Sequence, residues 1–294
     1  MRLFSKMLAG LAAVTALPAV AQDGLEIIGA PTPGAIGFQE AATELATDIH
    51  DLDSMLLVII TAIVLFVVAL MGVCIFIYNR RRNPNPATFT HNSPIEVAWT
   101  VIPIIVLVFI GAYSLPVLFK QQEIPEGEIN IKVTGYQWYW GYEYTDHEFG
   151  FDSYMIGQPA TVGNYVLTDE VEAALEEAGY SRNEFLLATD TAVVVPVNKT
   201  VVMTVTGADV IHSWTIPAFG VKQDAVPGRL AQLWFKAEKE GVYFGQCSEL
   251  CGKDHAYMPI TVKVVSEEAY EEWLQGAIEE YAGTPAGYDV ASAQ

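Results

Sequence analysis

Two long apolar runs constrain this chain more than any other feature of its sequence. Residues 56–78 and 97–119 are each 23 residues long and contain no charged side chain. At a rise of about 1.5 Å per residue, a helix of that length crosses a hydrocarbon core about 30 Å thick. Neither run has the continuous polar face that a helix at the surface of a soluble protein needs. We therefore expect two membrane-spanning helices that form a hairpin.

The loop between the two runs predicts the orientation of the hairpin. Residues 79–96 include Arg80, Arg81 and Arg82, three of the chain's 15 basic residues. Short loops rich in lysine and arginine stay on the cytoplasmic side of a membrane. Both ends of the chain are then expected on the outer side.

The N-terminus predicts export independently. Residues 1–21 combine a basic start, an apolar stretch and the small residues Ala19-Val20-Ala21, a pattern typical of a secretory signal peptide cleaved before Gln22. The alternative is a first membrane helix that is retained. We expect cleavage, which leaves residues 22–55 as an outer segment ahead of the first membrane helix.

Beyond Glu128 the sequence changes to short β-rich stretches broken by Gly, Pro and Asn. Short strands at this spacing predict an antiparallel sandwich or barrel, here over residues 120–266. An acidic helix from Asp169 to about Gly179 interrupts it, and a C-terminal helix and tail occupy 267–294. The expected strands are 130–144, 161–167, 191–197, 200–206, 229–236, 241–246 and 260–265.

The net charge of the chain limits the classes of partner that it can bind. The formal net charge is −20, and residues 120–294 alone carry 27 acidic and 10 basic side chains. So acidic a chain is not expected to bind nucleic acid, because binding requires neutralisation of phosphates by lysine and arginine. Many of these acids serve solubility, but such a field also steers a basic soluble partner toward the domain.

One stretch of the exported domain carries metal-binding chemistry. Cys247, Cys251, His255 and Met258 lie within twelve residues, and His212 supplies a second imidazole. Soft sulfur ligands combined with imidazole favour copper, whereas a zinc site more typically shows Cys-x2-Cys without methionine. Two thiols four residues apart could bridge a pair of coppers or, in an oxidising compartment, form a disulfide. The added imidazole and thioether favour the metal.

These motifs together resemble subunit II of the haem–copper cytochrome c oxidases. The resemblance rests on Cys-x3-Cys-x3-His-x2-Met, on the preceding His212-Ser213-Trp214, on the run 137–140 (Gln-Trp-Tyr-Trp) and on the two-helix anchor. It implies a two-helix transmembrane hairpin carrying an all-β cupredoxin-like barrel, a Greek-key sandwich, with a short helical insert and a C-terminal helix. The insert around 160–190 is longer than in the mitochondrial form and resembles a bacterial variant.

The resemblance also implies a dinuclear copper centre, called CuA, and a magnesium ion shared with subunit I. Glu249 would serve both metals, giving its backbone carbonyl to copper and its carboxylate to magnesium. The implied copper ligands are His212, Cys247, Glu249, Cys251, His255 and Met258.

In the same family, an exposed tryptophan matching Trp138 receives the electron from cytochrome c, and acidic neighbours orient that haem protein. By position, the candidate docking acids are Glu143, Asp152, Asp190 and Asp209. On a single strand, Trp138 would share a face with other aromatic residues at 136, 140, 142 and 144.

Glu96 has two interpretations that are compatible. Ser93, Pro94 and Glu96 fit a capping box at the start of the second membrane helix, with serine as the cap. The family resemblance adds that a glutamate here, on the cytoplasmic side, helps protons enter an uptake channel of the oxidase.

The resemblance implies an electron-entry subunit that is active only with the haem-bearing subunit I, accompanied by subunit III and membrane lipid, in a bacterial inner membrane. It would take electrons from cytochrome c for reduction of oxygen to water coupled to proton pumping. The main alternative is a membrane-anchored copper chaperone or thiol oxidoreductase, which would require a thioredoxin-like α/β pattern. A quinol oxidase subunit lacks the copper ligands, and nitrous oxide reductase lacks the hairpin.

Overall fold

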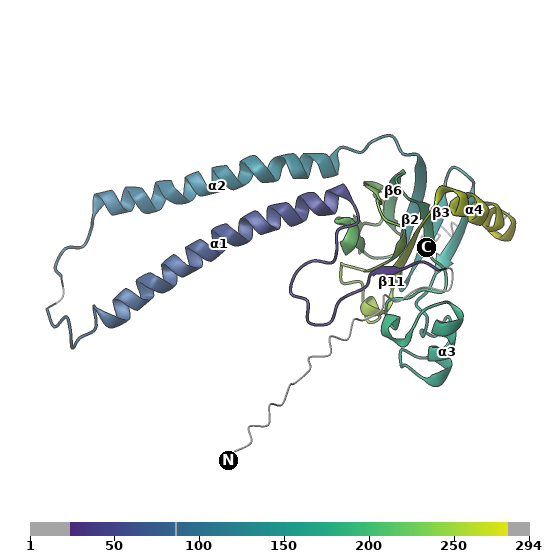
Figure 1. Ribbon diagram of the computed structural model, residues 1–294, viewed down its shortest axis with the longest axis horizontal. Coiled ribbons are helices and arrows are strands. Elements are labelled where there is room, and N and C mark those ends of the chain that lie inside the picture. Colours follow the sequence, from purple (N-terminus) through teal and green to yellow (C-terminus); the bar gives the residue numbers. More distant parts are fainter. Residues whose placement is uncertain (1–23, 86, 282–294) are drawn as a thin grey trace, which may run out of the picture.

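A long helical hairpin leaves one end of a β domain in the computed structural model, which describes residues 24–85 and 87–281 (Figure 1). The predicted signal peptide over 1–21 and the tail beyond 281 lie outside the described residues. The helices are α1 (Glu44–Phe76), α2 (Ser93–Gln122), α3 (Asp169–Glu177) and α4 (Glu267–Tyr281), with 3-10 turns η1 (Arg182–Glu184), η2 (Pro217–Phe219) and η3 (His255–Tyr257). The strands are β1 (Ile27–Gly29), β2 (Ile129–Tyr136), β3 (Tyr139–Tyr144), β4 (Phe149–Ser153), β5 (Val193–Pro196), β6 (Thr200–Gly207), β7 (His212–Ile216), β8 (Val221–Ala225), β9 (Ala231–Lys236), β10 (Gly241–Gln246) and β11 (Pro259–Val265).

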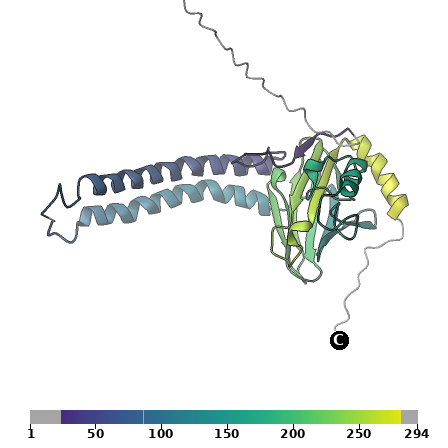
Figure 2. The same cartoon turned by 90° about the horizontal axis from the view of Figure 1, so that it is seen from below.

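The two hairpin helices run side by side away from the β domain in two perpendicular views (Figures 1 and 2). Their most apolar windows have mean hydropathies of 3.2 in α1 and 2.5 in α2, and no residue of either window is buried within the chain. Side chains this apolar and this exposed require a lipid or protein environment. By length and composition both helices can cross a membrane.

Helix α1 is longer than the charge-free run because it begins on the domain side at Glu44. The Thr43 side chain accepts the Ala46 N–H at 3.0 Å, which caps the first turn, and its hydroxyl donates to the Phe219 carbonyl at 2.7 Å. The start of α1 is thereby tied to η2 of the β domain.

A charged cluster joins the domain ends of both helices. Lys120, in the last turn of α2, lies 2.6 Å from a carboxylate oxygen of Glu44 and 2.6 Å from one of Asp48. The indole N–H of Trp234 on β9 donates to the Lys120 carbonyl at 3.2 Å. The hairpin is thus held at a defined place on the β domain.

The N-cap of α2, at the end remote from the β domain, lies one residue before the predicted position. Asn92, not Ser93, is the N-cap, and its side chain accepts the Ile95 N–H at 3.3 Å. The Glu96 carboxylate accepts the Asn92 N–H at 3.2 Å. Asparagine caps as well as serine, and this choice brings Ser93 into the first turn.

The β domain is built from two main sheets and a two-stranded ribbon. The sheet orders are β1-β10-β11-β5 and β4-β3-β2-β6-β9, and β7 pairs with β8. Three pairs depart from the antiparallel arrangement that the sequence predicts, because β1 runs parallel to β10, β2 to β6 and β5 to β11. Strict alternation on β2, with residues 129, 131 and 133 buried, directs every second side chain into the core.

Two predicted strands differ from the observed ones. The stretch 130–144 is a hairpin of β2 and β3, so Trp138 lies in the connecting turn and does not continue the buried face of Trp140. The stretch 161–167 forms turns, because Gly163 and Tyr165 adopt φ of 111° and 60° and the Tyr165 N–H donates to the Gly157 carbonyl at 2.8 Å. Extended pairing is incompatible with that backbone.

The helical insert and the C-terminal helix each cover part of the domain. In α3, Val171 and Leu175 are fully buried in a small second core together with Phe244 of β10. Helix α4 buries Tyr270, Leu274 and Ala277 against the main core. The insert lies at the side of the β domain away from the hairpin (Figure 1).

Candidate metal centre

The predicted copper loop connects two paired strands. β10 ends at Gln246, which pairs with Pro259 at the start of β11, so residues 247–258 are closed at their base. The Ser248 N–H donates to the carbonyl of Ser213 at 3.0 Å, which joins the loop to β7. Because His212 begins β7, this contact brings the distant imidazole beside the loop.

Five predicted copper donors lie in one chain of contacts. The Sγ atoms of Cys247 and Cys251 are 3.8 Å apart. Nδ1 of His212 is 4.0 Å from the first sulfur, and Nδ1 of His255 is 3.5 Å from the second. Sδ of Met258 is 3.5 Å from the sulfur of Cys251. Each thiol therefore has its own imidazole, and one has a thioether in addition.

The sixth predicted donor is a backbone oxygen. The Glu249 carbonyl lies 3.3 Å from the Sγ of Cys247, whereas the residue itself is exposed. Protein ligands of one metal, each bonded at about 2.0–2.3 Å, lie roughly 3.5 Å apart. The observed separations of 3.3–4.0 Å and the soft sulfur and imidazole donors therefore fit copper. Cys247 and Cys251 are free thiols, so the disulfide alternative is not formed.

The protein prepares the two thiols differently. Although burial opposes it, hydrogen bonding with His212 and with backbone groups lowers the pKa of Cys247. Burial and the charge of the neighbouring Cys247 sulfur raise the pKa of Cys251. Metal binding by a cysteine requires the thiolate form and releases its proton, so a metal held by both sulfurs would favour ionisation of both.

A carboxylate orients the histidine of β7. Nε2 of His212 lies 2.8 Å from Oδ1 of Asp209, and the same carboxylate accepts the Gln137 N–H at 2.8 Å. The His212 ring is fully buried and packs against Gly135. A Cβ added at Gly135 would lie 2.8 Å from the ring, so only glycine leaves room for it. Such a partner fixes the tautomer and leaves Nδ1 toward Cys247.

Trp138 contacts the loop directly, although it lies in a turn. Its indole N–H donates to the carbonyl of Cys251 at 3.2 Å, and the Gln137 amide donates to the same oxygen at 2.8 Å. Gly252 permits this approach because its φ is 128° and a Cβ there would meet Trp138 Cζ2 at 2.9 Å. Lys253 Nζ lies 5.3 Å from the Trp138 ring.

The structure also shows contributors that the sequence analysis did not identify. Trp140 is fully buried, donates to the Met258 carbonyl at 3.1 Å and has its ring 5.9 Å from that of His212. From the sequence, Gln137 is only the first residue of the run 137–140. No local signal could have paired residues more than 100 positions apart in the chain.

Three of the four predicted docking acids surround one aromatic residue. Burial and the charges of Asp152, Asp209 and Glu143 together raise the pKa of Tyr136, which precedes the turn that holds Trp138. Asp190 accepts the N–H of Tyr154 at 2.8 Å, and after burial the charges of Asp152 and Asp190 both raise the pKa of Tyr154.

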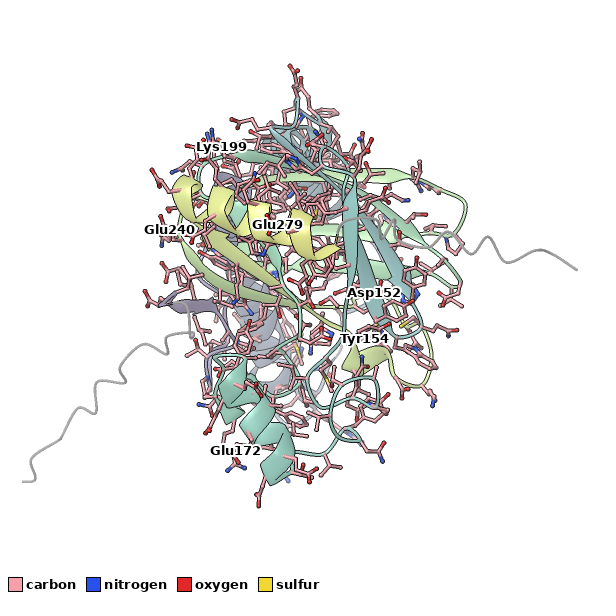
Figure 3. All side chains as sticks on the ribbon, turned by 90° about the vertical axis from the view of Figure 1, so that its right-hand side faces the viewer. Asp152, Tyr154, Glu172, Lys199, Glu240 and Glu279 are labelled. Carbon is pink, nitrogen blue, oxygen red and sulfur yellow. The ribbon has the colours of Figure 1, made fainter. Side chains whose placement is uncertain are left out.

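Other acids lie elsewhere on the domain. Figure 3 shows Asp152 and Tyr154 close together, while Glu172, Glu240 and Glu279 lie on separate parts of the surface. Glu143 is partly neutralised by Lys132 at 3.3 Å. The negative charge is therefore distributed, with one local concentration near Trp138.

Glu96 is the predicted site residue that the structure keeps apart from all the others. It lies at the end of α2 remote from the β domain (Figure 1). Among the described residues, its hydrogen bonds are with Asn92 and Thr100 and do not reach the copper loop, so any function there is separate.

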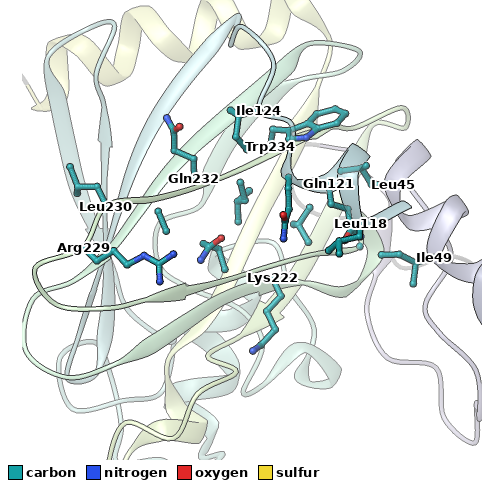
Figure 4. Close-up of a pocket in the computed structure, with 16 residues that line it drawn as sticks. Leu45, Ile49, Leu118, Gln121, Ile124, Lys222, Arg229, Leu230, Gln232 and Trp234 are labelled. Carbon is teal, nitrogen blue, oxygen red and sulfur yellow. The ribbon is translucent and has the colours of Figure 1, made fainter. Parts of the chain in front are cut away.

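A cavity of about 760 Å³ lies where the hairpin meets the β domain (Figure 4). Its walls include Leu45 of α1, Leu118 of α2, Lys222 of β8 and Trp234 of β9, with Arg229 at its side. None of the predicted copper ligands lines it.

Comparisons with known proteins agree with this arrangement. The sequence model of the cytochrome c oxidase subunit II periplasmic domain matches residues 129–265, and that of its transmembrane domain matches 31–117. The chain is 68% identical over 269 residues to cytochrome c oxidase subunit 2 of Cereibacter sphaeroides, covering 92% of this chain and 88% of that protein. It is 44% identical over 245 residues to a probable cytochrome c oxidase subunit 2 of Rickettsia bellii, covering 83% and 84%.

A solved structure is also similar. The crystallised periplasmic domain of subunit II of cytochrome oxidase from Bradyrhizobium japonicum is 46% identical, with a TM-score of 0.44, covering 54% of this chain and 99% of that one. The family matches and the observed elements confirm the predicted fold class. The thioredoxin-like pattern required by the chaperone alternative is not found among the described residues.

Proposed function

Because this chain belongs to the cytochrome c oxidase subunit II family, we propose that it is the electron-entry subunit, taking electrons from reduced cytochrome c and delivering them to haem in subunit I. Oxygen is reduced to water there, coupled to proton pumping. The family makes it a membrane subunit with a periplasmic domain that acts within the oxidase complex. One observation carries the proposal: two thiols 3.8 Å apart, each with its own imidazole.

The residues that would hold a dinuclear copper centre are those of the contact chain. The ligand set is His212, Cys247, Glu249 by its carbonyl, Cys251, His255 and Met258. When bound, the two coppers supply a one-electron carrier whose charge is shared through the two sulfurs. Burial of both cysteines and of Met258 excludes water and reduces the solvent reorganisation that accompanies a change of charge.

Electron entry is assigned to Trp138. Its side chain is only partly buried, yet its indole donates to the carbonyl of Cys251, a proposed ligand. A single side chain thus connects the protein surface with the copper loop. Asp209 contacts both His212 and the backbone of Gln137, which ties the turn carrying Trp138 to the centre.

The docking surface is proposed to be the acidic patch around this turn. Glu143, Asp152 and Asp209 act together on Tyr136, and Asp190 extends the patch through Tyr154. A basic cytochrome c would be steered to these acids, and its association rate would fall as salt screens them.

Two further assignments concern subunit I. The Glu249 carboxylate is proposed to bind magnesium shared with subunit I, since carboxylate oxygens are the ligands that magnesium prefers. The adjacent Leu250 is 77% exposed, as expected of a side chain that a partner covers. Glu96 is proposed to assist proton entry on the cytoplasmic side. Subunit III and a bacterial inner-membrane location complete the proposal.

The function is tested by rapid mixing of reduced cytochrome c with the purified oxidase complex. Trp138→Ala should slow electron entry several-fold while the electron paramagnetic resonance spectrum of the copper stays unchanged, because no ligand is altered. The matched control is Trp273→Ala on α4, an aromatic residue that packs against Tyr144 away from the copper loop. Equal entry rates for Trp138→Ala and the wild type would contradict the assigned role.

A further inference from the structure

The insert between β4 and β5 approaches the copper loop with one aromatic side chain. Tyr165 adopts φ of 60°, a conformation that residues other than glycine rarely adopt, and its N–H donates to the Gly157 carbonyl at 2.8 Å. Thr161 bonds within the same turn, its hydroxyl accepting the Gly157 N–H at 3.1 Å. From this tightly wound backbone the Tyr165 ring reaches the copper loop.

Two contacts join that ring to the loop. The Tyr165 hydroxyl donates to Oδ2 of Asp254 at 3.0 Å. The ring stacks on Tyr257 with centroids 4.3 Å apart and an interplanar angle of 29°. Asp254 is only 8% exposed, so its carboxylate depends on protein partners. Besides the Tyr165 hydroxyl, the Lys253 ammonium lies 3.5 Å from the same carboxylate.

These contacts lie on both sides of η3. Asp254 directly precedes His255, and Tyr257 directly precedes Met258. The turn is closed by the Tyr257 N–H donating to the Asp254 carbonyl at 2.9 Å. A single side chain of the insert therefore holds both ends of the short turn that presents an imidazole and a thioether.

We propose that Tyr165 is a positioning residue that sets the placement of His255 and Met258 at the copper centre, which makes the insert part of the metal site. The proposal rests on the proposed function, because it presumes that these two residues bind copper. An insert that only stabilised its own small core would need no polar contact with the loop. The partly buried hydrogen bond to Asp254 is such a contact.

The experiment compares Tyr165→Phe with the wild-type oxidase complex. Phenylalanine keeps the stacking on Tyr257 and removes only the hydroxyl, so folding of the insert should be retained. Loss of a residue that bonds a metal ligand directly typically costs 10–100-fold in affinity. Tyr165 acts one residue further out, through Asp254 and Tyr257, so the lower end of that range applies. We expect copper release to a chelator to be about 10-fold faster and the paramagnetic resonance spectrum of the copper to change, with a shifted reduction potential.

The matched control is Tyr180→Phe, which removes a hydroxyl from the same insert at a ring packed on Phe244 rather than on the copper loop. It should leave the copper spectrum unchanged. In a double-mutant cycle with Asp254→Asn, the effects of the two substitutions on the rate of copper release should be non-additive, since the two side chains share one hydrogen bond.

The outcomes separate the two proposals. If wild-type protein holds two coppers but Tyr165→Phe matches it in release rate, spectrum and potential, the positioning role is refuted, even if the variant melts at a lower temperature. If wild-type protein itself holds no copper pair, the proposed function fails first.

Discussion

Gly252→Ala perturbs the contact between Trp138 and the copper loop without altering any proposed ligand. Gly252 has φ of 128°, outside the range that alanine adopts without strain. An added Cβ would lie 2.9 Å from Cζ2 of Trp138 and 3.1 Å from Nε2 of Gln137. The indole must shift and the Gln137 amide must give by a few tenths of an ångström, and both donate to the carbonyl of Cys251.

The magnitude follows from these two effects. A residue forced into a sparsely populated backbone region costs about 1–3 kcal/mol. Weakening two hydrogen bonds adds about 0.5–1.5 kcal/mol each. The free energy of unfolding should therefore fall by about 2–6 kcal/mol, with a lower melting temperature, unless the loop shifts. In either case the indole is displaced from Cys251.

Gly228→Ala is the matched control. Gly228 also has a positive φ, 75°, but a Cβ there meets no atom within 4 Å. Alanine at this position therefore introduces backbone strain but no steric clash. We expect both variants to be destabilised, Gly252→Ala more so, and only Gly252→Ala to slow electron entry from cytochrome c several-fold.

The assay is single-turnover oxidation of cytochrome c by each purified oxidase complex, together with thermal unfolding. If Gly252→Ala accepted electrons as fast as Gly228→Ala, the contact between Trp138 and the loop would not govern entry. The proposed route would then be wrong even if the variant were less stable.

Two further outcomes follow from side chains away from the copper loop. Glu96→Ala should lower oxidase turnover with a changed pH dependence and leave helix content unchanged, because Asn92 still caps α2; unchanged turnover at every pH would contradict its proton role. The hydroxyl of Ser213, helped by Lys222, holds the pKa of Asp224 below its usual range. Its contribution to stability is therefore complete above about pH 4 and lost as the pH falls through the lower folded-state pKa. In Asp224→Asn, the free energy of unfolding from denaturant titrations should fall less steeply between about pH 4 and lower pH than in the wild type. The same fall in both proteins would exclude this carboxylate as a source of the acid sensitivity.

The sequence predicted the features that are encoded locally. The hairpin helices follow from uninterrupted apolar runs. Helix α4 (Glu267–Tyr281) begins where the predicted C-terminal helix and tail, 267–294, begin, because its apolar residues recur at helical spacing. Four of the proposed copper ligands with side-chain donors lie within twelve residues, so their proximity required only that the loop be closed by β10 and β11.

Features that depend on distant contacts were missed or misplaced. Strands β7 and β8 were not predicted, since their residues show no clear alternation. The parallel pairs depend on which strands meet, and alternation within one strand does not indicate this. The contacts of Tyr165 with Asp254 and of Trp138 with Cys251 join residues 89 and 113 positions apart.

The central claim is that Cys247 and Cys251 together hold two coppers, and electron paramagnetic resonance combined with metal analysis of the full-length chain in the assembled complex tests it most directly. The account predicts two coppers per chain at this site and, in the oxidised form, one unpaired electron whose hyperfine splitting involves both metals equally. A single copper with an ordinary one-metal spectrum, or a disulfide between the two cysteines in metal-loaded protein, would contradict it.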